Sequence, residues 1–275
     1  MDIKAILLDF DGTALQKDQV YISVRTMYAI RKAMEKGVII IPSTGRVEDM
    51  QPPQIEAEPG IRYWITSGGS RVVDHQTGEV IYQCIWTPEE SARLCRIFEG
   101  QKIYSEIAAA GKIFMEKEVA DHLERYPVPS HHVWFVELGR QIAVESLAEH
   151  FLKNGIGMEK INIYGVPAEK QQSIYQSLEE TGLVHMTDPA GVNIQCFPVH
   201  LDRTKAMDAL LKKLGIGMEE VMSIGDSGMD ASAIKASGLG VAMGNAPGWV
   251  KEQADYVTLS NEEDGVAAAI EKFVL

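Results

Sequence analysis

The sequence predicts an α/β protein with a parallel central sheet and a second α/β domain inserted into the chain. Short apolar runs alternate with helical stretches near both ends, as in the βαβ units of a parallel sheet. The middle of the chain is more polar and less regular. With 275 residues, the chain is long enough for one large domain or two smaller ones.

The N-terminal part has the pattern of two buried strands separated by a helix. Ile3–Asp9 is apolar on both faces, which is typical of a central parallel strand. Ser23–Lys36 has helical spacing, begins at a capping serine and stops at Gly37. Val38–Pro42 is the second buried strand, and Arg62–Thr66 is a candidate third strand.

The middle of the chain mixes short strands and helices. Val72–Tyr82 alternates around a glycine turn, which predicts a β-hairpin. Thr87 is followed by a proline and two glutamates, an N-cap and capping box that open a helix reaching about Glu99. The other predicted elements here are the strands Ile113–Glu116, Trp134–Glu137 and Ile161–Tyr164 and the helices Glu145–Lys153 and Glu169–Glu180.

The pattern of a parallel sheet returns in the last third of the chain. The predicted elements are the strand Val192–Phe197, the helix Arg203–Leu214, and the strands Val221–Ile224, Gly240–Met243 and Tyr256–Leu259. We therefore expect residues 1–83 and 191–275 to form one α/β core. Residues 84–190 would form the inserted α/β domain.

Charge and hydropathy exclude two classes of partner. The chain has 26 basic and 39 acidic side chains, a net charge of −13, whereas nucleic-acid-binding proteins present a basic face. No apolar run approaches the roughly 20 residues of a membrane-spanning helix, and the first residues predict a strand rather than a secretion signal. Three cysteines without CxxC spacing predict inert thiols. We expect a cytoplasmic protein with no nucleic-acid or membrane partner.

Two carboxylates follow the first predicted strand, in the segment Asp9–Thr13 with the sequence DFDGT. Ligands of open α/β sheets bind at the carboxyl ends of the strands, so Asp9 and Asp11 can share a crevice. Two like charges this close require a cation, or one of them must hold a proton. Magnesium prefers oxygen ligands of this kind. The alternative is an acidic surface turn.

Two other sites carry groups suited to phosphate. In Ser43–Arg46, directly after a predicted strand, the hydroxyl of Thr44 and the N–H groups of the turn at Gly45 can cradle phosphate. Lys205 stands in the first turn of a predicted helix, where the helix dipole opposes a cation unless an anion binds nearby. Each has a plainer alternative, which is a capped turn for Thr44 and a solvated side chain for Lys205.

A second carboxylate pair stands in the segment Gly225–Asp230, directly after a predicted strand. Asp226 could complete a magnesium site with Asp9 and Asp11. Asp230 could then orient a group bound to the metal. The alternative is the capped start of a helix.

These four features together resemble the pattern of the haloacid-dehalogenase-like hydrolases: DxD, then Ser or Thr, then Lys, then GDxxxD. The segments Gly240–Ala246, Ala254–Thr258 and Asp264–Val266 are similar to the ending of the Cof-type sugar-phosphatase branch of that superfamily. The resemblance implies a Rossmann-like core and an inserted α/β cap that sets substrate specificity.

The resemblance also implies a magnesium-dependent phosphatase that acts on a small phosphorylated metabolite, with a sugar phosphate as the first candidate. Asp9 would be the nucleophile that forms an aspartyl-phosphate, and Asp11 would be the general acid and then the base. The implied residues are Asp9 and Asp11 for catalysis; Thr44, Gly45 and Lys205 for phosphate binding; and Asp9, Asp11 (through its backbone carbonyl), Asp226 and Asp230 for Mg²⁺.

Two positions depart from the family pattern. Met229 stands where asparagine usually precedes the final aspartate, and Gly68–Gly69 stands where the branch tends to have Asn-Gly. Two other functions stay open. A phosphomutase would move phosphate within one sugar by the same nucleophile, and a non-catalytic sensor of a phosphorylated ligand would accommodate Met229 and Gly68.

Overall fold

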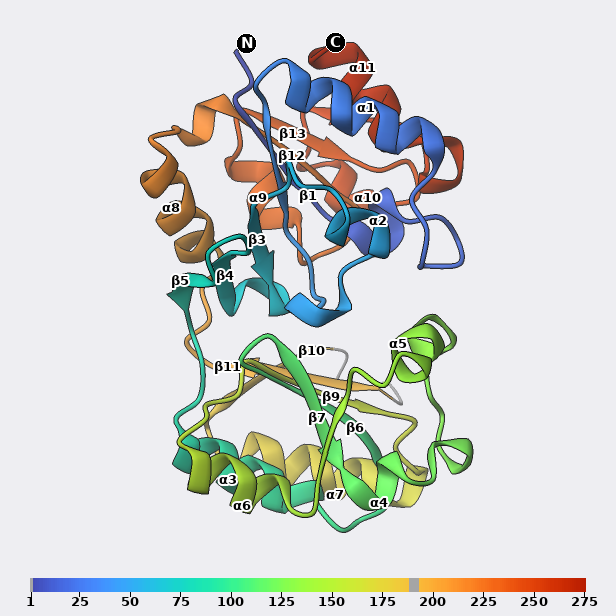
Figure 1. Ribbon diagram of the computed structural model, residues 1–275, viewed down its shortest axis with the longest axis vertical. Helices are drawn as coiled ribbons and strands as arrows, with labels where there is room; N and C mark the ends of the chain where they lie inside the picture. Colours follow the sequence, from blue (N-terminus) through green and yellow to red (C-terminus); the bar gives the residue numbers. More distant parts are fainter. Residues whose placement is uncertain (1, 188–192) are drawn as a thin grey trace. The chain divides into compact units, whose positions relative to one another are not determined.

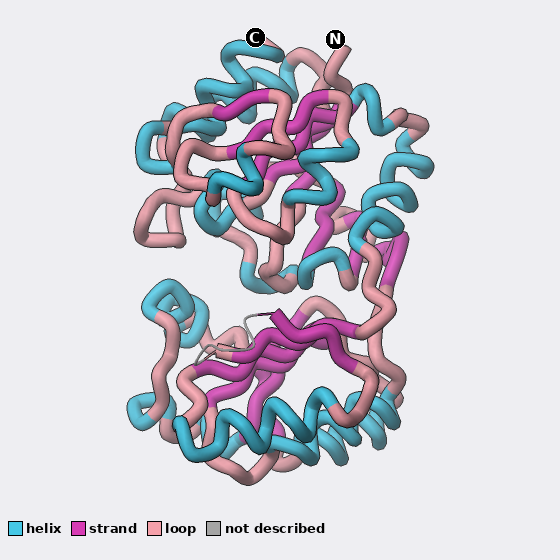
Figure 2. Tube along the Cα trace, turned by 180° about the vertical axis from the view of Figure 1, so that it is seen from behind, coloured by secondary structure: helices cyan, strands magenta, loops and turns pink. Residues whose placement is uncertain are grey.

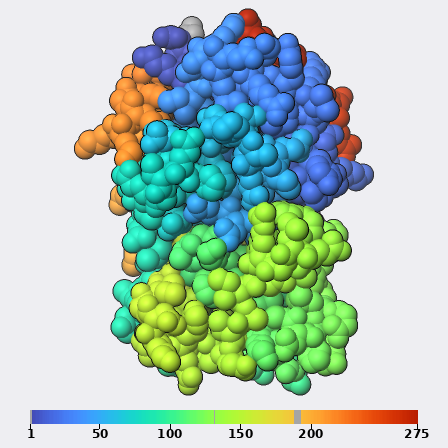
Figure 3. Space-filling model, viewed as in Figure 1, coloured from blue at the N-terminus to red at the C-terminus, as the bar shows by residue number. Residues whose placement is uncertain are grey.

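The computed structural model describes residues 2–187 and 193–275 and divides the chain into two compact units. Unit 1 consists of Met1–Arg46, Gln51–Gln83 and Asp202–Leu275, and unit 2 of Val47–Met50 and Cys84–Leu201. The surface of unit 1 joins blue N-terminal residues with orange and red C-terminal residues, whereas green and yellow residues form the surface of unit 2 (Figure 3). The two ends of the chain therefore fold together.

Unit 1 is built on a parallel sheet of five strands. β1 is central, with Ala5 opposite both Val221 and Ile39 on the two neighbouring strands. Its strands are apolar on both sides because helices cover both faces. In spatial order the strands are β14 (Tyr256–Val257), β13 (Leu239–Ala242), β12 (Val221–Gly225), β1 (Ala5–Leu8) and β2 (Ile39–Pro42).

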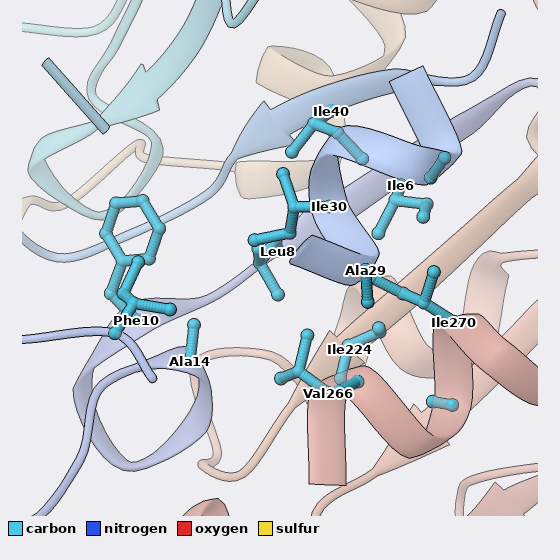
Figure 4. Packing of buried hydrophobic residues seen from close by; sticks show 14 of the residues in the cluster. Ile6, Leu8, Phe10, Ala14, Ala29, Ile30, Ile40, Ile224, Val266 and Ile270 are labelled. Carbon is cyan, nitrogen blue, oxygen red and sulfur yellow. The ribbon is translucent and has the colours of Figure 1, made fainter. Parts of the chain in front are cut away.

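The helices of unit 1 bury the two faces of this sheet separately. On one face, Ile6 and Leu8 pack against Ile30 of α1 and Ile270 of α11 (Figure 4). On the other face, the sheet packs against the apolar sides of α8 and α9. The helices are α1 (Val24–Glu35), α2 (Pro53–Glu56), α8 (Arg203–Leu214), α9 (Ala231–Ala236), α10 (Gly248–Lys251) and α11 (Gly265–Phe273).

A small antiparallel sheet extends unit 1 beyond β2. It comprises β3 (Tyr63–Thr66), β4 (Arg71–Asp74) and β5 (Glu79–Gln83), and it includes the predicted hairpin. A parallel bridge between Ser43 and Ile65 joins it to the end of β2.

Unit 2 has a six-stranded sheet that is mostly antiparallel. Helices α3, α6 and α7 pack over one face of it, as Figure 1 shows. In spatial order its strands are β10 (Val184–Thr187), β11 (Ile194–Pro198), β9 (Lys160–Tyr164), β6 (Tyr104–Ala109), β7 (Lys112–Glu116) and β8 (Ile142–Val144). Its helices are α3 (Pro88–Phe98), α4 (Lys117–Ala120), α5 (Val133–Glu137), α6 (Leu147–Asn154) and α7 (Ala168–Glu179). The trace from behind shows the same helical layer against this sheet (Figure 2).

The predicted α/β fold class and several of its local signals are confirmed. The side chain of Ser23 accepts a hydrogen bond from the N–H of Thr26 at the start of α1. Thr87 and Glu90 form the predicted capping box of α3. Gly215 ends α8 with a φ of +68°, which a glycine adopts without steric cost.

Two predicted strands are wrong, and three strands of unit 2 were not predicted. The segment predicted as a strand at Trp134–Glu137 lies in helix α5, because four residues do not distinguish a helical from an extended period. No predicted element corresponds to β6, β8 or β10. The strand predicted at Val192–Phe197 is not part of the parallel core, since β11 pairs antiparallel with β9 and β10.

The position of β11 also changes the boundary between the two units. The expected boundary at residues 190 and 191, like Val192, lies outside the described residues. Because β11 belongs to the sheet of unit 2, the chain returns to unit 1 only at Asp202. Val47–Met50 also joins unit 2, where Val47 and Met50 pack beside Tyr104 and Met115.

Among the described residues, no helix has both the length and the apolar character needed to cross a bilayer.

Candidate active site

A pocket in unit 1 collects residues from the ends of the parallel strands. The strands β1, β2 and β12 run in the same direction, so the segments that follow them meet at one edge of the sheet. The lining residues are Asp9, Ser43, Thr44, Gly45, Ile65, Gly68, Gly69, Arg203, Met207, Met229, Asp230, Ser232 and Ala233.

Three carboxylates gather at this edge. Asp9, Asp226 and Asp230 each offer an oxygen atom, and the three atoms lie within 4.8 Å of one another. Asp9 follows β1 directly, is 8 % exposed, and donates its backbone N–H to the carbonyl of Ile224 on β12. A compact set of carboxylate oxygens is the donor set that a hard cation such as Mg²⁺ prefers.

The loops that carry Asp9 and Asp226 are held against each other. Thr13 Oγ1 donates to Asp226 Oδ1 at 3.2 Å, and Asn245 Nδ2 donates to the carbonyl of Gly12 at 2.8 Å. Gly12 has a φ of +81°, and a Cβ there would lie 2.4 Å from Asp226 Oδ2. Only glycine therefore allows the two loops to approach this closely.

Asp230 is fixed by its own loop. Its Oδ2 atom accepts hydrogen bonds from the backbone N–H of Ser227 at 2.9 Å and from Ser227 Oγ at 2.7 Å. A Cβ on Gly225 would lie 2.3 Å from Asp230 Cβ, so glycine is needed at the end of β12 as well. Asp230 is thereby oriented beside Asp9 and Asp226.

Burial and mutual repulsion make these carboxylates hard to ionise without a cation. Burial, followed by the charges of Asp230, Asp11 and Asp226, raises the pKa of Asp9 well above its usual value. Burial and Asp230 raise the pKa of Asp226 to about 6. Burial also raises the pKa of Asp230. A bound cation would reverse this penalty by favouring the charged forms.

The Asp11 side chain is not part of the carboxylate cluster. Arg46 binds it with two hydrogen bonds, Nε to Oδ2 at 2.8 Å and Nη2 to Oδ1 at 2.6 Å. The Arg46 side chain is 5 % exposed and also donates to the carbonyl of Gln19 at 2.6 Å. Of the four predicted metal-binding residues, Asp9, Asp226 and Asp230 therefore bring their side chains together. Asp11, which the resemblance implies as a ligand through its backbone carbonyl, has its side chain paired with Arg46.

The predicted phosphate-binding turn is in place. Thr44 and Gly45 both line the pocket beside Asp9. Thr44 is 3 % exposed, and its Oγ1 accepts the backbone N–H of Arg46 at 3.2 Å, which fixes the turn. The Thr44 N–H donates to Ile65 and its carbonyl accepts from Gly68, which ties the turn to the small sheet.

The cation of this pocket is Arg203, not Lys205. Lys205 is exposed and does not line the pocket, whereas Arg203 is partly buried there. Residues two apart on a helix lie on opposite sides. The buried residues Ala206 and Met207 stand three and four positions after Arg203, so Arg203 shares the inward face of α8. The helical period of these apolar residues was the signal that could have identified it.

Arg203 is embedded among the groups that depart from the family pattern. Burial lowers the pKa of Arg203, while the carboxylates of Asp230 and Asp9 raise it. Its Nη1 donates to the carbonyl of Met229 at 3.1 Å. A Cβ on Gly69 would lie 3.2 Å from Arg203 Cγ, so the glycine leaves room for the arginine stem. Gly68 and Met229 line the same pocket.

Known proteins are similar to this chain in sequence and in fold over its whole length. The family model for haloacid dehalogenase-like hydrolases matches residues 6–270. The 5-amino-6-(5-phospho-D-ribitylamino)uracil phosphatase YcsE of Bacillus subtilis is 31 % identical over 100 % of this chain and 97 % of its own length. A phosphoglycolate phosphatase of Methanothermobacter thermautotrophicus is 27 % identical over 99 % of both chains.

Solved structures of similar proteins have the same fold as this chain. A haloacid dehalogenase-like hydrolase from Bacteroides thetaiotaomicron superimposes with a TM-score of 0.80 at 26 % identity, covering 98 % of this chain and 99 % of its own. One from B. subtilis has a TM-score of 0.76 at 27 % identity, covering 98 % and 100 %. The resemblance predicted from the motifs is confirmed, and the chain belongs to the haloacid dehalogenase-like hydrolases.

Proposed function

We propose that this hydrolase is a Mg²⁺-dependent phosphatase that cleaves a phosphomonoester of a small metabolite, with sugar phosphates as the substrate class. The observation that carries the proposal is the pocket of unit 1, where Asp9 lies beside the carboxylates of Asp226 and Asp230, the turn at Thr44 and Arg203. YcsE and the phosphoglycolate phosphatase, both phosphatases by name, support the same reaction class.

In the proposed reaction, an Asp9 oxygen attacks phosphorus in line and the bond from phosphorus to the leaving alcohol breaks. Asp11 donates a proton to the alcohol, then takes a proton from the water that attacks the aspartyl-phosphate. The products are the alcohol and inorganic phosphate, and Asp9 is regenerated. Thr44, the Gly45 N–H and Arg203 would bind the phosphoryl oxygens during both steps.

Asp9, Asp226 and Asp230 would hold Mg²⁺, which would offset the repulsion between the Asp9 carboxylate and a phosphate dianion. The cluster is small and partly buried, and all three donors are carboxylates, which fits a hard divalent cation. The Asp11 side chain takes no part in this set, and its role in the proposal is proton transfer alone.

Arg46 gives Asp11 a defined resting position. A general acid must carry a proton, whereas the two hydrogen bonds from Arg46 stabilise the ionised carboxylate. Asp11 would therefore leave Arg46 before the first proton transfer. Among the described residues, the cysteines Cys84, Cys95 and Cys196 form no disulfide, which suits a reducing compartment, and we place the activity in the cytoplasm.

The test is phosphate release from a panel of sugar phosphates, nucleotides and p-nitrophenyl phosphate, with Mg²⁺ and with EDTA. We expect Mg²⁺-dependent release that Asp9→Asn reduces at least about a thousandfold. Asp208→Asn, on the exposed side of α8, is the matched control and should keep full activity.

Three results would contradict the proposal. Comparable hydrolysis by Asp9→Asn would exclude Asp9 as the nucleophile. Isomer formation without phosphate release would identify a phosphomutase. Binding of a phosphorylated ligand with no turnover over hours would identify a sensor.

A further inference from the structure

Ser43 lines the pocket of unit 1 but has no part in the proposed reaction. It follows β2 directly and is partly buried. The turn that begins at Ser43 contributes only Thr44 and Gly45 to the proposed phosphate site. A serine hydroxyl at this place can serve as a further hydrogen-bond donor to a phosphoryl oxygen.

Ser43 stands next to Asp9 across the parallel sheet. Leu8 of β1 pairs with Pro42 of β2, so Asp9 and Ser43 are the next residues along the same two strands. The backbone N–H of Ser43 donates to the carbonyl of Leu8 at 2.9 Å, which continues the pairing past the end of β2. Neighbouring strands lie about 4.7–4.9 Å apart. Ser43 is therefore carried beside the carboxylate that attacks phosphorus in the proposed reaction.

Asp9 and Ser43 also belong to the same face of the sheet. Leu7 and Ile41, which stand two residues before them, pack on the face that α8 and α9 cover. Side chains two residues apart on a strand share a face, so Asp9 and Ser43 continue these two rows. Arg203, the first residue of α8, lines the pocket on this side of the sheet. The fold thus brings a carboxylate, a hydroxyl and a guanidinium group to one side of the pocket.

The hydroxyl of Ser43 is available to a ligand. It makes no hydrogen bond within the described part of the chain, whereas Thr44 Oγ1 accepts the backbone N–H of Arg46 at 3.2 Å. A hydroxyl carries one donor hydrogen, which rotates to suit its acceptor. Ser43 can therefore donate to an oxygen atom in the pocket without losing a hydrogen bond to the protein.

The pocket has few other side chains that could supply such a donor. In the transition state of phosphoryl transfer, negative charge spreads over the three equatorial oxygens of the phosphoryl group. Met229 stands where the family pattern has asparagine, and its side chain has no polar hydrogen. Ser232 is exposed. Among the described residues that line the pocket, the side chains with a donor hydrogen are those of Ser43, Thr44, Arg203 and Ser232.

We propose that Ser43 is a further catalytic residue, whose hydroxyl donates a hydrogen bond to a phosphoryl oxygen as Asp9 attacks phosphorus. This rests on the proposed function, because the phosphoryl group is that of the phosphomonoester. The Ser43 proton stays on its oxygen, and Ser43 forms no bond to phosphorus. A donor placed where charge develops lowers the barrier, and it stabilises the transition state more than bound phosphate.

The first measurement is the steady-state kinetics of Ser43→Ala with p-nitrophenyl phosphate and Mg²⁺. We expect kcat to fall about ten- to a hundredfold while KM changes less than about threefold, because the lost hydrogen bond acts mainly in the transition state. Ser43→Thr keeps a hydroxyl at the same position and should recover most of the lost kcat.

The second measurement separates this role from a structural one. Orthovanadate adopts a five-coordinate geometry similar to that of the transition state, whereas inorganic phosphate is the product. Calorimetry in the presence of Mg²⁺ gives the Kd of each. Ser43→Ala should weaken vanadate binding at least about tenfold and phosphate binding far less. Distortion of the pocket would weaken the binding of both ions alike.

The matched control is Ser70→Ala in the same unit. Ser70 directly follows Gly69, is fully buried, and has an Oγ atom that is also without a hydrogen-bond partner. It does not line the pocket. Ser70→Ala therefore removes a similar hydroxyl nearby and should keep the kcat and the vanadate affinity of the parent. Thermal melting checks that all variants fold.

Three results would overturn the inference. They are a kcat of Ser43→Ala within about twofold of the parent, equal losses of kcat in Ser43→Ala and Ser43→Thr, and equal weakening of vanadate and phosphate binding. The proposed function fails separately, if the unmodified enzyme releases no phosphate from any substrate of the panel. Vanadate binding that depends on the Ser43 hydroxyl would then leave the inference standing.

Discussion

The pocket of unit 1 and the buried polar pair Glu106 and Asn162 of unit 2 are assembled in different ways. In unit 1, Asp9, Thr44 and Asp230 stand in segments that follow parallel strands, so each is marked by its place after an apolar run. In unit 2, Glu106 and Asn162 lie inside strands and meet only because β6 and β9 pair. Residues in the loops therefore form a chemical motif that can be recognised in the sequence, whereas the neighbourhood of Glu106 and Asn162 depends on the pairing register of two strands.

The largest effect we expect in this comparison is the loss of Arg203. Arg203→Ala should lower kcat/KM about a hundred- to a thousandfold, as removal of one donor to the transition-state charge typically does. Lys205→Ala, two residues along the same helix, should stay within about twofold of the parent. Steady-state kinetics of both variants give the two kcat/KM values. Equal decreases in kcat/KM would contradict a role for Arg203 in the pocket that Lys205 does not share.

The next effect concerns the cation. Asp226→Asn should raise the Mg²⁺ concentration for half-maximal activity by about ten- to a hundredfold, because it removes a charged oxygen from the cluster. Mg²⁺ titrations of activity measure this concentration, and an unchanged half-maximal concentration would place the metal elsewhere.

A smaller effect is expected when Arg203 is replaced by lysine, the residue that the family pattern has. Arg203→Lys should lower kcat/KM about tenfold, because lysine presents one charged centre where arginine presents a planar fork of donors. Adding Met229→Asn should restore part of that loss, since the amide returns a donor to the same pocket. Kinetics of the single and double variants test this. A double variant with a lower kcat/KM than Arg203→Lys alone would show that Met229→Asn does not compensate for the loss of the arginine.

The smallest effect is on stability rather than chemistry. Arg62 donates to Asp74 at 2.9 Å and is the main cause that lowers the pKa of Asp74 to about 2 from 3.8. The folded state therefore holds this carboxylate ionised more strongly than the unfolded state. Its stabilisation is present above pH about 4 and is lost as the pH falls toward 2.

Asp74→Asn should lower the free energy of unfolding at pH 7 by about 1–2 kcal/mol, a value reduced by the partial exposure of Arg62. The difference from the parent should shrink as the pH falls toward 2. Urea denaturation at several pH values measures it. A difference that does not change with pH would show that the ion pair is not its source.

Much of unit 1 follows from local patterns in the sequence. The buried strands, the serine cap of α1 and the glycine end of α8 are short-range features, and Asp9, Thr44, Gly45, Asp226 and Asp230 stand where these patterns place them. Arg203 was missed because the lysine of the family pattern was sought by residue type. The helical phase of Ala206 and Met207 points to Arg203 instead.

Unit 2 was less predictable because its structure depends on long-range pairing. β6 contains the buried Tyr104, Glu106 and Ala108 on one face, and the glutamate breaks the apolar signature of a strand. β11 reads as a parallel core strand because it is apolar, but its partners β9 and β10 are antiparallel. The ion pair between Asp11 and Arg46 joins residues 35 positions apart and has no local signal.

The central claim is that Asp9 is phosphorylated during turnover. The most direct measurement is acid quenching of the enzyme during reaction with substrate and Mg²⁺, followed by borohydride reduction and peptide mass spectrometry. Borohydride reduces an acyl phosphate, so an aspartyl-phosphate is recovered as homoserine. We expect homoserine at position 9 only when substrate is present. Homoserine at position 11 or 226, or none under conditions of active turnover, would contradict it.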